Sequence, residues 1–94
     1  MQNGDYVVVR TYSAGVHYGV LAGRDGKEVT LTEARHIWRW NSGALTVSDI
    51  AVAGLKAAQV SATAPEIVLS EAIEVIKCTD SAATLLRAIE AFKS

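Results

Sequence analysis

Arginine and tryptophan side chains gather in one short segment near the middle of the chain. The segment reads Arg-His-Ile-Trp-Arg-Trp-Asn over residues 35–41, and it contains both tryptophans of the protein. Guanidinium groups bind phosphate oxygens through paired hydrogen bonds, and indole rings stack on nucleobases. The pattern therefore indicates a nucleotide site, and its candidate ligand contacts are Arg35, Trp38, Arg39, Trp40 and Asn41. The alternative is a core role for the tryptophans, with the arginine heads reaching water.

If this segment forms a strand, alternate side chains point to opposite faces of the sheet. His36, Trp38 and Trp40 would then share one face. The two arginines and Ile37 would share the other face.

A second candidate site lies near the N-terminus, where the chain reads Arg-Thr-Tyr-Ser-Ala-Gly over residues 10–15. It combines a cation, hydroxyl groups, an aromatic ring and a flexible turn. Such a group of residues can bind an anion, or it can simply close a hairpin. The candidate contacts in this segment are Arg10, Thr11, Tyr12 and Ser13.

The sequence offers no convincing catalytic set. There is no strand-Gly-x-Ser-x-Gly elbow for a serine nucleophile, no phosphate-cradling glycine loop and no dinucleotide-binding glycine pattern. The single cysteine, Cys78, excludes an internal disulfide and is expected to be a buried, inert thiol. With only His17 and His36 beside it, a four-ligand zinc site would need scattered carboxylates. We therefore predict no catalytic residue, no metal site and no cofactor.

Length and charge limit the remaining classes of function. The chain has 94 residues, which predicts a single domain over residues 1–94. Its formal net charge of −1 gives no field that would draw it onto a DNA or RNA duplex or an anionic membrane. Polar residues follow Met1, and no apolar run approaches the ~18 residues that span a bilayer. A soluble cytoplasmic protein is the expectation.

Strand signals dominate the first part of the chain. β-branched and aromatic residues predict strands over residues 5–12, 16–23 and 28–31, and the Asp25-Gly26 pair suits a tight hairpin turn before the third strand. Gly19 and Gly23 interrupt the second strand. They indicate a bulge or a close backbone approach, and the alternative is a ligand lying flat on the strand.

An internal similarity relates two parts of the chain. Residues 28–40 align without gaps on residues 66–78, with four identical positions. In each segment a two-residue period slips at a Glu-Ala pair and then resumes, which predicts a strand, a corner and a second strand. The two segments would be copies of one element, and chance similarity is the alternative.

Two amphipathic helices complete the predicted fold. Thr46 and Asp49 resemble a capping box before apolar residues at helical spacing through Ala58. Residues 59–64 then read as a linker. A second helix begins after a cap within residues 79–81, and its apolar stripe is Ala82, Leu85, Leu86, Ile89 and Phe92. The fold class is therefore α+β: a small antiparallel sheet with an internal two-copy strand element, covered by two amphipathic helices.

Four stretches of the chain resemble a family of small bacteriophage proteins, and together they cover most of its length. They are Val9–Val16, Gly26–Val29, Ala34–Trp40 and Leu69–Glu74, and the most specific motifs are Arg-Thr-Tyr-Ser-Ala-Gly-Val and Ala-Arg-x-Ile-Trp-x-Trp. That family is in turn similar to the Thoeris anti-defence sponge, a phage protein that sequesters cyclic nucleotide signals made by bacterial immune enzymes.

The resemblance implies a homo-oligomer of small α+β protomers that binds without turnover. Its ligand would be a cyclic ADP-ribose-type signal or a related cyclic nucleotide in the cytoplasm of the host bacterium. Side-chain chemistry then suggests stacking through Trp38 or Trp40, phosphate contacts from Arg10, Arg35 or Arg39, and polar contacts from Thr11, Tyr12, Ser13 or Asn41.

Two other functions stay open at this point. One is an anti-CRISPR-type inhibitor that binds a host defence protein through an exposed patch. The other is a structural or accessory phage module, in which the tryptophans would belong to a core or to a subunit interface.

Overall fold

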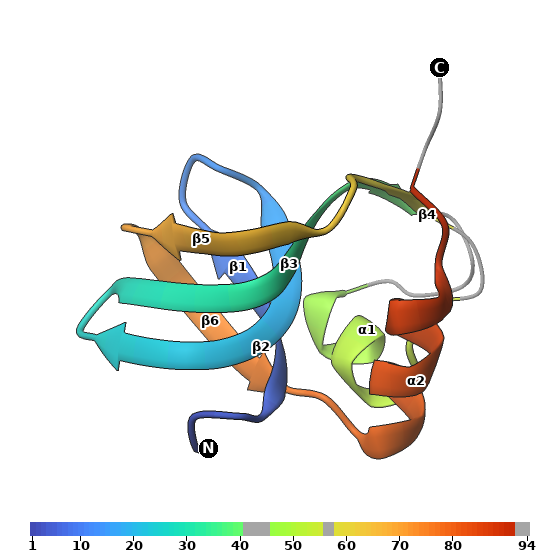
Figure 1. Cartoon of the computed structure of the whole chain (residues 1–94), viewed down its shortest axis with the longest axis horizontal. Coiled ribbons are helices and arrows are strands. Elements are labelled where there is room, and N and C mark those ends of the chain that lie inside the picture. The colour runs from blue at the N-terminus through green and yellow to red at the C-terminus, as the bar shows by residue number, and fades with distance from the viewer. Residues whose placement is uncertain (41–45, 56–57, 92–94) are drawn as a thin grey trace.

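The computed structural model describes residues 1–40, 46–55 and 58–91. These residues form six strands and two helices (Figure 1). In chain order the elements are β1 (Tyr6–Thr11), β2 (Val16–Asp25), β3 (Glu28–Trp40), α1 (Val47–Ala53), β4 (Ala58–Val60), β5 (Ala64–Leu69), β6 (Ala72–Lys77) and α2 (Asp80–Ala88). The α+β class predicted from the sequence is confirmed. Neither helix in this described part of the chain has the length and apolar character needed to cross a membrane.

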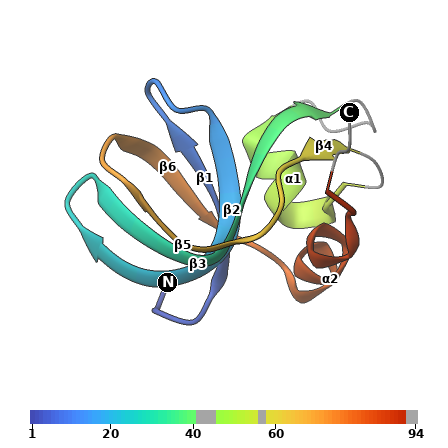
Figure 2. The ribbon, with the colours of Figure 1, turned by 45° about the horizontal axis from the view of Figure 1, so that its top comes forward.

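All six strands belong to one antiparallel sheet. Its order is β4-β3-β2-β1-β6, and β5 pairs with β3 beside this path. The sheet curls strongly: β5 lies beside β3, β6 lies beside β1, and the two helices lie together at one side of the sheet (Figure 2). Two backbone hydrogen bonds hold the corner between β5 and β6: Ala72 N–H donates to Lys27 O at 3.0 Å, and Tyr12 N–H donates to Glu71 O at 3.0 Å.

Strand β1 is buried on both faces. Val7 and Val9 point into the curl of the sheet, whereas Tyr6 and Val8 point toward the helices. The inner core, inside the curl, consists of Val7, Val9, Leu21, Val29, Leu31, Ala34, Leu69 and Ala72. The helix-side core consists of Tyr6, Val8, Tyr18, Ile37, Val47, Ile50, Ala51, Leu55, Val60, Cys78, Ala82, Ala83 and Leu86. An unbroken apolar run, rather than alternation, is what a strand covered on both faces requires.

Helix α1 begins as predicted and ends early. Thr46 Oγ1 accepts a hydrogen bond from Asp49 N–H at 3.3 Å, and Thr46 N–H donates to Asp49 Oδ2 at 3.1 Å, so the capping box is present. Gly54 has φ +73° and stops the helix four residues before Ala58. Residues 58–60, expected as the helix end and a linker, instead form β4 and pair with the end of β3. That part of the prediction was wrong, because strand pairing outweighs the weak local preferences there.

Helix α2 follows the prediction more closely. Thr79 Oγ1 accepts from Ala82 N–H at 3.1 Å and caps the helix. Ala82 and Leu86 are buried and Ile89 packs against the same core, whereas Leu85 is exposed. Phe92 lies outside the described residues.

The two similar segments both bend at their Glu-Ala pairs. Residues 28–40 form the single strand β3, which bends at Glu33 with φ +49°, and residues 66–78 are divided into β5 and β6 by the corner at residues 70–71. Their first halves are neighbours in the sheet, with Thr30 opposite Val68. That the segments are copies of one element stays a prediction.

Gly19 lies opposite a bulge in β3, as one of the sequence interpretations stated. Tyr18 pairs with Arg35 and Val20 pairs with Thr32, so two residues of β3 face one residue of β2. A Cβ atom on Gly19 would lie 2.8 Å from Thr32 O and 3.1 Å from Ala34 Cα. Gly23, beside a second register shift, has open space around it.

We therefore expect Gly19→Ala to lower the free energy of unfolding by ~1–3 kcal/mol, because the added methyl meets backbone atoms that cannot turn away. Gly23→Ala is the matched control and should change it by less than about 0.5 kcal/mol. Urea denaturation of both variants measures the difference. Equal effects would show that the close approach at Gly19 does not limit the fold.

Candidate functional site

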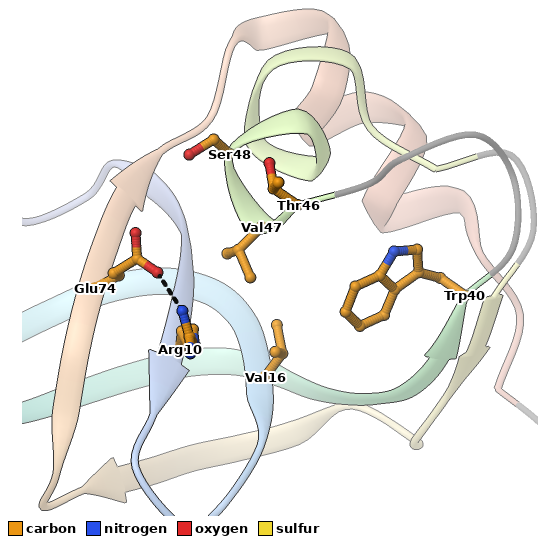
Figure 3. A pocket seen from close by; sticks show the side chains of 7 residues that line it. All are labelled: Arg10, Val16, Trp40, Thr46, Val47, Ser48 and Glu74. Atoms are coloured by element: carbon orange, nitrogen blue, oxygen red, sulfur yellow. Dashed lines mark hydrogen bonds and ion pairs between the residues drawn. The ribbon is translucent and has the colours of Figure 1, made fainter.

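One pocket brings together residues from the two candidate motifs. It has a volume of about 510 Å³, and it is lined by Arg10, Val16, Trp40, Thr46, Val47, Ser48 and Glu74 (Figure 3). Arg10 comes from the N-terminal motif and Trp40 from the Arg-Trp motif. We call this hollow the Arg10–Trp40 pocket.

The apolar wall of the pocket is continuous with the helix-side core. Val47 belongs to that core, and both Val16 and Trp40 pack against it. Figure 3 shows the indole of Trp40 extending from the end of β3 toward Val16 and Val47. A partly buried ring beside aliphatic side chains provides a flat apolar surface for a planar group.

The polar wall is formed by an ion pair between neighbouring strands. Arg10 of β1 is the register partner of Glu74 of β6, and Arg10 Nη1 lies 3.2 Å from Glu74 Oε1. The side chains are 54% and 42% exposed. A water-exposed ion pair contributes little to stability, so its partners exchange readily between each other and another hydrogen-bonding group. The pocket therefore offers a cation and an anion side by side.

Hydroxyl groups at the start of α1 complete the lining. Thr46 Oγ1 is part of the helix cap and also lies 3.1 Å from Asp49 Oδ2. Ser48, in the first turn of α1, adds a second hydroxyl to this side of the pocket.

The other candidates of the N-terminal motif close the β1–β2 hairpin. Thr11 Oγ1 donates to Gly15 O at 2.8 Å and accepts from Ala14 N–H at 2.9 Å. Ser13 Oγ lies 3.4 Å from Glu71 Oε2, and the side chain of Tyr12 is exposed. Thr11, Tyr12 and Ser13 do not line the Arg10–Trp40 pocket, and ligand contacts by them stay predictions.

Arg35 is buried and engaged within the fold. Its Nε donates to Ser61 O at 3.0 Å, and its Nη1 donates to Ile89 O just beyond the C-terminal end of α2. A cation at that end of a helix also interacts favourably with the helix dipole. The phosphate contact suggested for Arg35 stays a prediction, and the proposals below do not use it.

The two tryptophans do not share one environment, so the expectation of a common face was wrong. Trp38 is half exposed and its Nε1–H donates to Gln59 Oε1 at 2.8 Å, whereas Trp40 packs against the core that contains Ile37. The pairing of β3 with β4 shifts register between Ile37 and Arg39, which breaks strict alternation. Arg39 is exposed and does not line the pocket, and Asn41 lies outside the described residues.

Sequence reasoning missed most of the pocket lining. Glu74 resembled an ordinary surface charge on a strand, and Thr46 was identified only as a helix cap. The sequence around Val16, Val47 and Ser48 indicates a strand and a helix and gives no signal of a pocket. Only the pairing of β1 with β6 places Glu74 opposite Arg10, and no local pattern reveals that register.

Two stacked histidines lie beside the β1–β2 hairpin. His17 and His36 are register partners, and their rings lie 4.5 Å apart at 14°. His17 is 4% exposed, and its Nδ1 has no hydrogen-bond partner among the described residues. Burial, with a smaller effect of His36, lowers the pKa of His17 to about 4. Nowhere in residues 1–40, 46–55 and 58–91 do three His, Cys, Asp or Glu side chains come together as a metal site would need.

Cys78 is buried in the helix-side core, as expected from the sequence. Burial raises the pKa of its thiol to about 11. The thiol is therefore protonated near neutral pH and has little nucleophilic character.

Comparison with known proteins gives one family. A family model described as a domain of unknown function, DUF6948, matches residues 4–86. No curated protein and no solved structure matches the chain. The matched range contains every residue that lines the Arg10–Trp40 pocket.

We expect Arg35→Gln to lower the free energy of unfolding by ~2–4 kcal/mol, because two backbone carbonyls lose a charged donor inside the fold. Arg39→Gln, an exposed position on the same strand, is the control and should change it by less than about 0.5 kcal/mol. Chemical denaturation of the two variants tests this. A small effect at both positions would contradict a structural role for Arg35.

The pKa of His17 predicts a loss of stability in acid. The unfolded chain binds a proton at His17 near pH 6.5, whereas the folded chain binds it only near pH 4. The free energy of unfolding is therefore highest above pH 6.5 and decreases as the pH falls from 6.5 to 4. The loss should reach about 3 kcal/mol. In His17→Phe, denaturation curves across this range should depend less on pH. An unchanged pH dependence would show that other groups cause it.

Proposed function

The chain belongs to the DUF6948 family, and we propose that it is a non-enzymatic phage counter-defence protein that binds and sequesters a cyclic nucleotide immune signal of the bacterial host. The observation that carries the proposal is the Arg10–Trp40 pocket. Arg10, from a motif that suggested anion binding, and Trp40, from a motif that suggested nucleotide chemistry, contribute to one hollow in the fold.

The chemistry of the pocket supports a ligand that combines a planar ring with polar groups. Trp40 and two valines offer an apolar surface for the ring, and Arg10, Glu74 and the hydroxyls of α1 offer hydrogen bonds. A volume of about 510 Å³ falls within the range of small-molecule sites. Nucleotides have this combination of ring, hydroxyls and charge.

The sequestering role comes from the resemblance of four stretches of the chain to the phage family, and from the similarity of that family to the Thoeris anti-defence sponge. Such a protein needs affinity and no turnover, and it acts in the host cytoplasm as a homo-oligomer. Binding without catalysis also agrees with a pocket in which the titratable side chains among the described lining residues are one arginine and one glutamate that pair with each other.

A protein-binding inhibitor is the second candidate, and a separate observation favours it. The side chain of Tyr12 is 80% exposed beside the tip of the β1–β2 hairpin. Exposed aromatic rings are enriched where proteins bind one another. This candidate predicts a complex with a host defence protein and no response of the protein to nucleotides.

Native mass spectrometry distinguishes these candidates directly. The protein is purified from cells with an active cyclic-nucleotide defence system, and its mass is compared before and after denaturation. A released small molecule supports sequestration, and its mass identifies the signal. A mass that contains only protein, together with no binding of cyclic ADP-ribose or a cyclic dinucleotide added in vitro, would contradict the proposal.

The two tryptophans allow a matched test of where the ligand binds. Trp38→Phe leaves Trp40 as the single tryptophan, and its fluorescence should still change when the signal nucleotide is added. Trp40→Leu leaves only Trp38, which lies outside the pocket lining, and should weaken binding at least about tenfold because it removes the aromatic ring on which a base stacks. Titration by calorimetry measures both affinities. Equal affinities in the two variants would place the ligand elsewhere.

A further inference from the structure

The ion pair in the Arg10–Trp40 pocket has a pattern of donors and acceptors that matches one nucleobase. We propose that Arg10 and Glu74 read the edge of a guanine base, so that the ligand of this pocket is a guanine nucleotide. The inference rests on the proposed function and adds to it the identity of the base. It also gives Arg10 a different role from the phosphate contact suggested by the sequence.

The contact between the two side chains leaves hydrogen-bonding capacity on both. It joins Arg10 Nη1 to Glu74 Oε1 at 3.2 Å, and within the described residues neither side chain has another hydrogen bond or ion pair. The guanidinium carries five N–H donors, and a carboxylate has about four lone-pair positions. A ligand can therefore bond to both groups while they stay close together.

The negative charge of Glu74 argues against a phosphate bound to Arg10. A phosphate bound to the guanidinium would lie beside the Glu74 carboxylate, and like charges at such short distance repel. A neutral group with an acceptor beside a donor meets no such repulsion. The acceptor bonds to Arg10, and the donor bonds to Glu74.

Guanine presents the complementary order of groups. Along its pairing edge, O6 is an acceptor, and N1–H and the N2 amino group are adjacent donors. Across the ion pair, Arg10 Nη1 is a donor, and Glu74 Oε1 and Oε2 are adjacent acceptors. Adenine carries a single exocyclic donor between two ring acceptors, so it satisfies only one carboxylate oxygen. Hypoxanthine has the carbonyl and the N1–H of guanine but lacks the N2 amino group, and it should bind with intermediate affinity.

The rest of the pocket is compatible with a base in this position. Trp40 lies across the hollow from Arg10 and Glu74, with the valines between them (Figure 3). A base whose edge meets the ion pair can thus place its ring against the indole and the aliphatic side chains. Ser48 then offers its hydroxyl at the side where sugar or phosphate oxygens need a donor, whereas the Thr46 hydroxyl donates to Asp49 Oδ2.

Four probes test the inference by tryptophan fluorescence in the Trp38→Phe protein. They are guanosine, inosine and adenosine 5′-monophosphates and ribose 5-phosphate, which has no base. We expect the guanine nucleotide to bind at least about tenfold more tightly than the adenine nucleotide, with the inosine nucleotide between them. Glu74→Gln replaces one acceptor by a donor and should remove this preference. Glu71→Gln is the matched control, because Glu71 bonds to Ser13 outside the pocket lining.

The outcomes separate this inference from the proposed function. If ribose 5-phosphate binds as well as the nucleotides, or if Glu74→Gln keeps the guanine preference, the pair does not read a base and the inference is overturned. The same holds if cyclic nucleotides bind the protein but none of the four probes does. If neither the probes nor cyclic nucleotides bind, the proposed function fails together with the inference.

Discussion

The burial of β1 on both faces is the constraint on which the rest of the structure depends. Val7, Val8 and Val9 are fully buried, and the strand is paired on both edges, by β2 and by β6. One face needs the curl of the sheet to cover it, and the other needs the two helices. Arg10 is the exposed residue that follows this run. Its backbone is therefore held by the most buried part of the protein, although its side chain reaches the pocket.

Much of the fold was predictable because its signals are local. The apolar run of β1, the Asp25-Gly26 turn and the cap at Thr46 each involve residues within a few positions of one another. Gly26 has the positive φ of +59° that its turn requires. Strand β4 and the early end of α1 were not predictable in this way, because β4 exists only through its pairing with the end of β3.

The site was also predictable only in part, because some of its features depend on contacts between residues far apart in the sequence. The sequence indicated Arg10 and Trp40 by their chemistry, but it could not show that Arg35, with similar chemistry, is buried against the end of α2. Nor could it place Glu74 beside Arg10. That pairing depends on the register between β1 and β6, which shifts at the next residue pair. Chemistry is visible in single residues, whereas proximity across strands appears only in the folded chain.

The pairing of β1 with β6 also has a consequence for synthesis. Strand β1, which is made before the other five strands of the sheet, receives its second neighbour only when residues 72–77 have been made. Until then, one edge of a strongly apolar strand offers free N–H and C=O groups, which pair readily with other extended chains. The pairing of β1 on both edges therefore forms only after β6 has been translated. Fragments that end before β6 are expected to aggregate and to need chaperones.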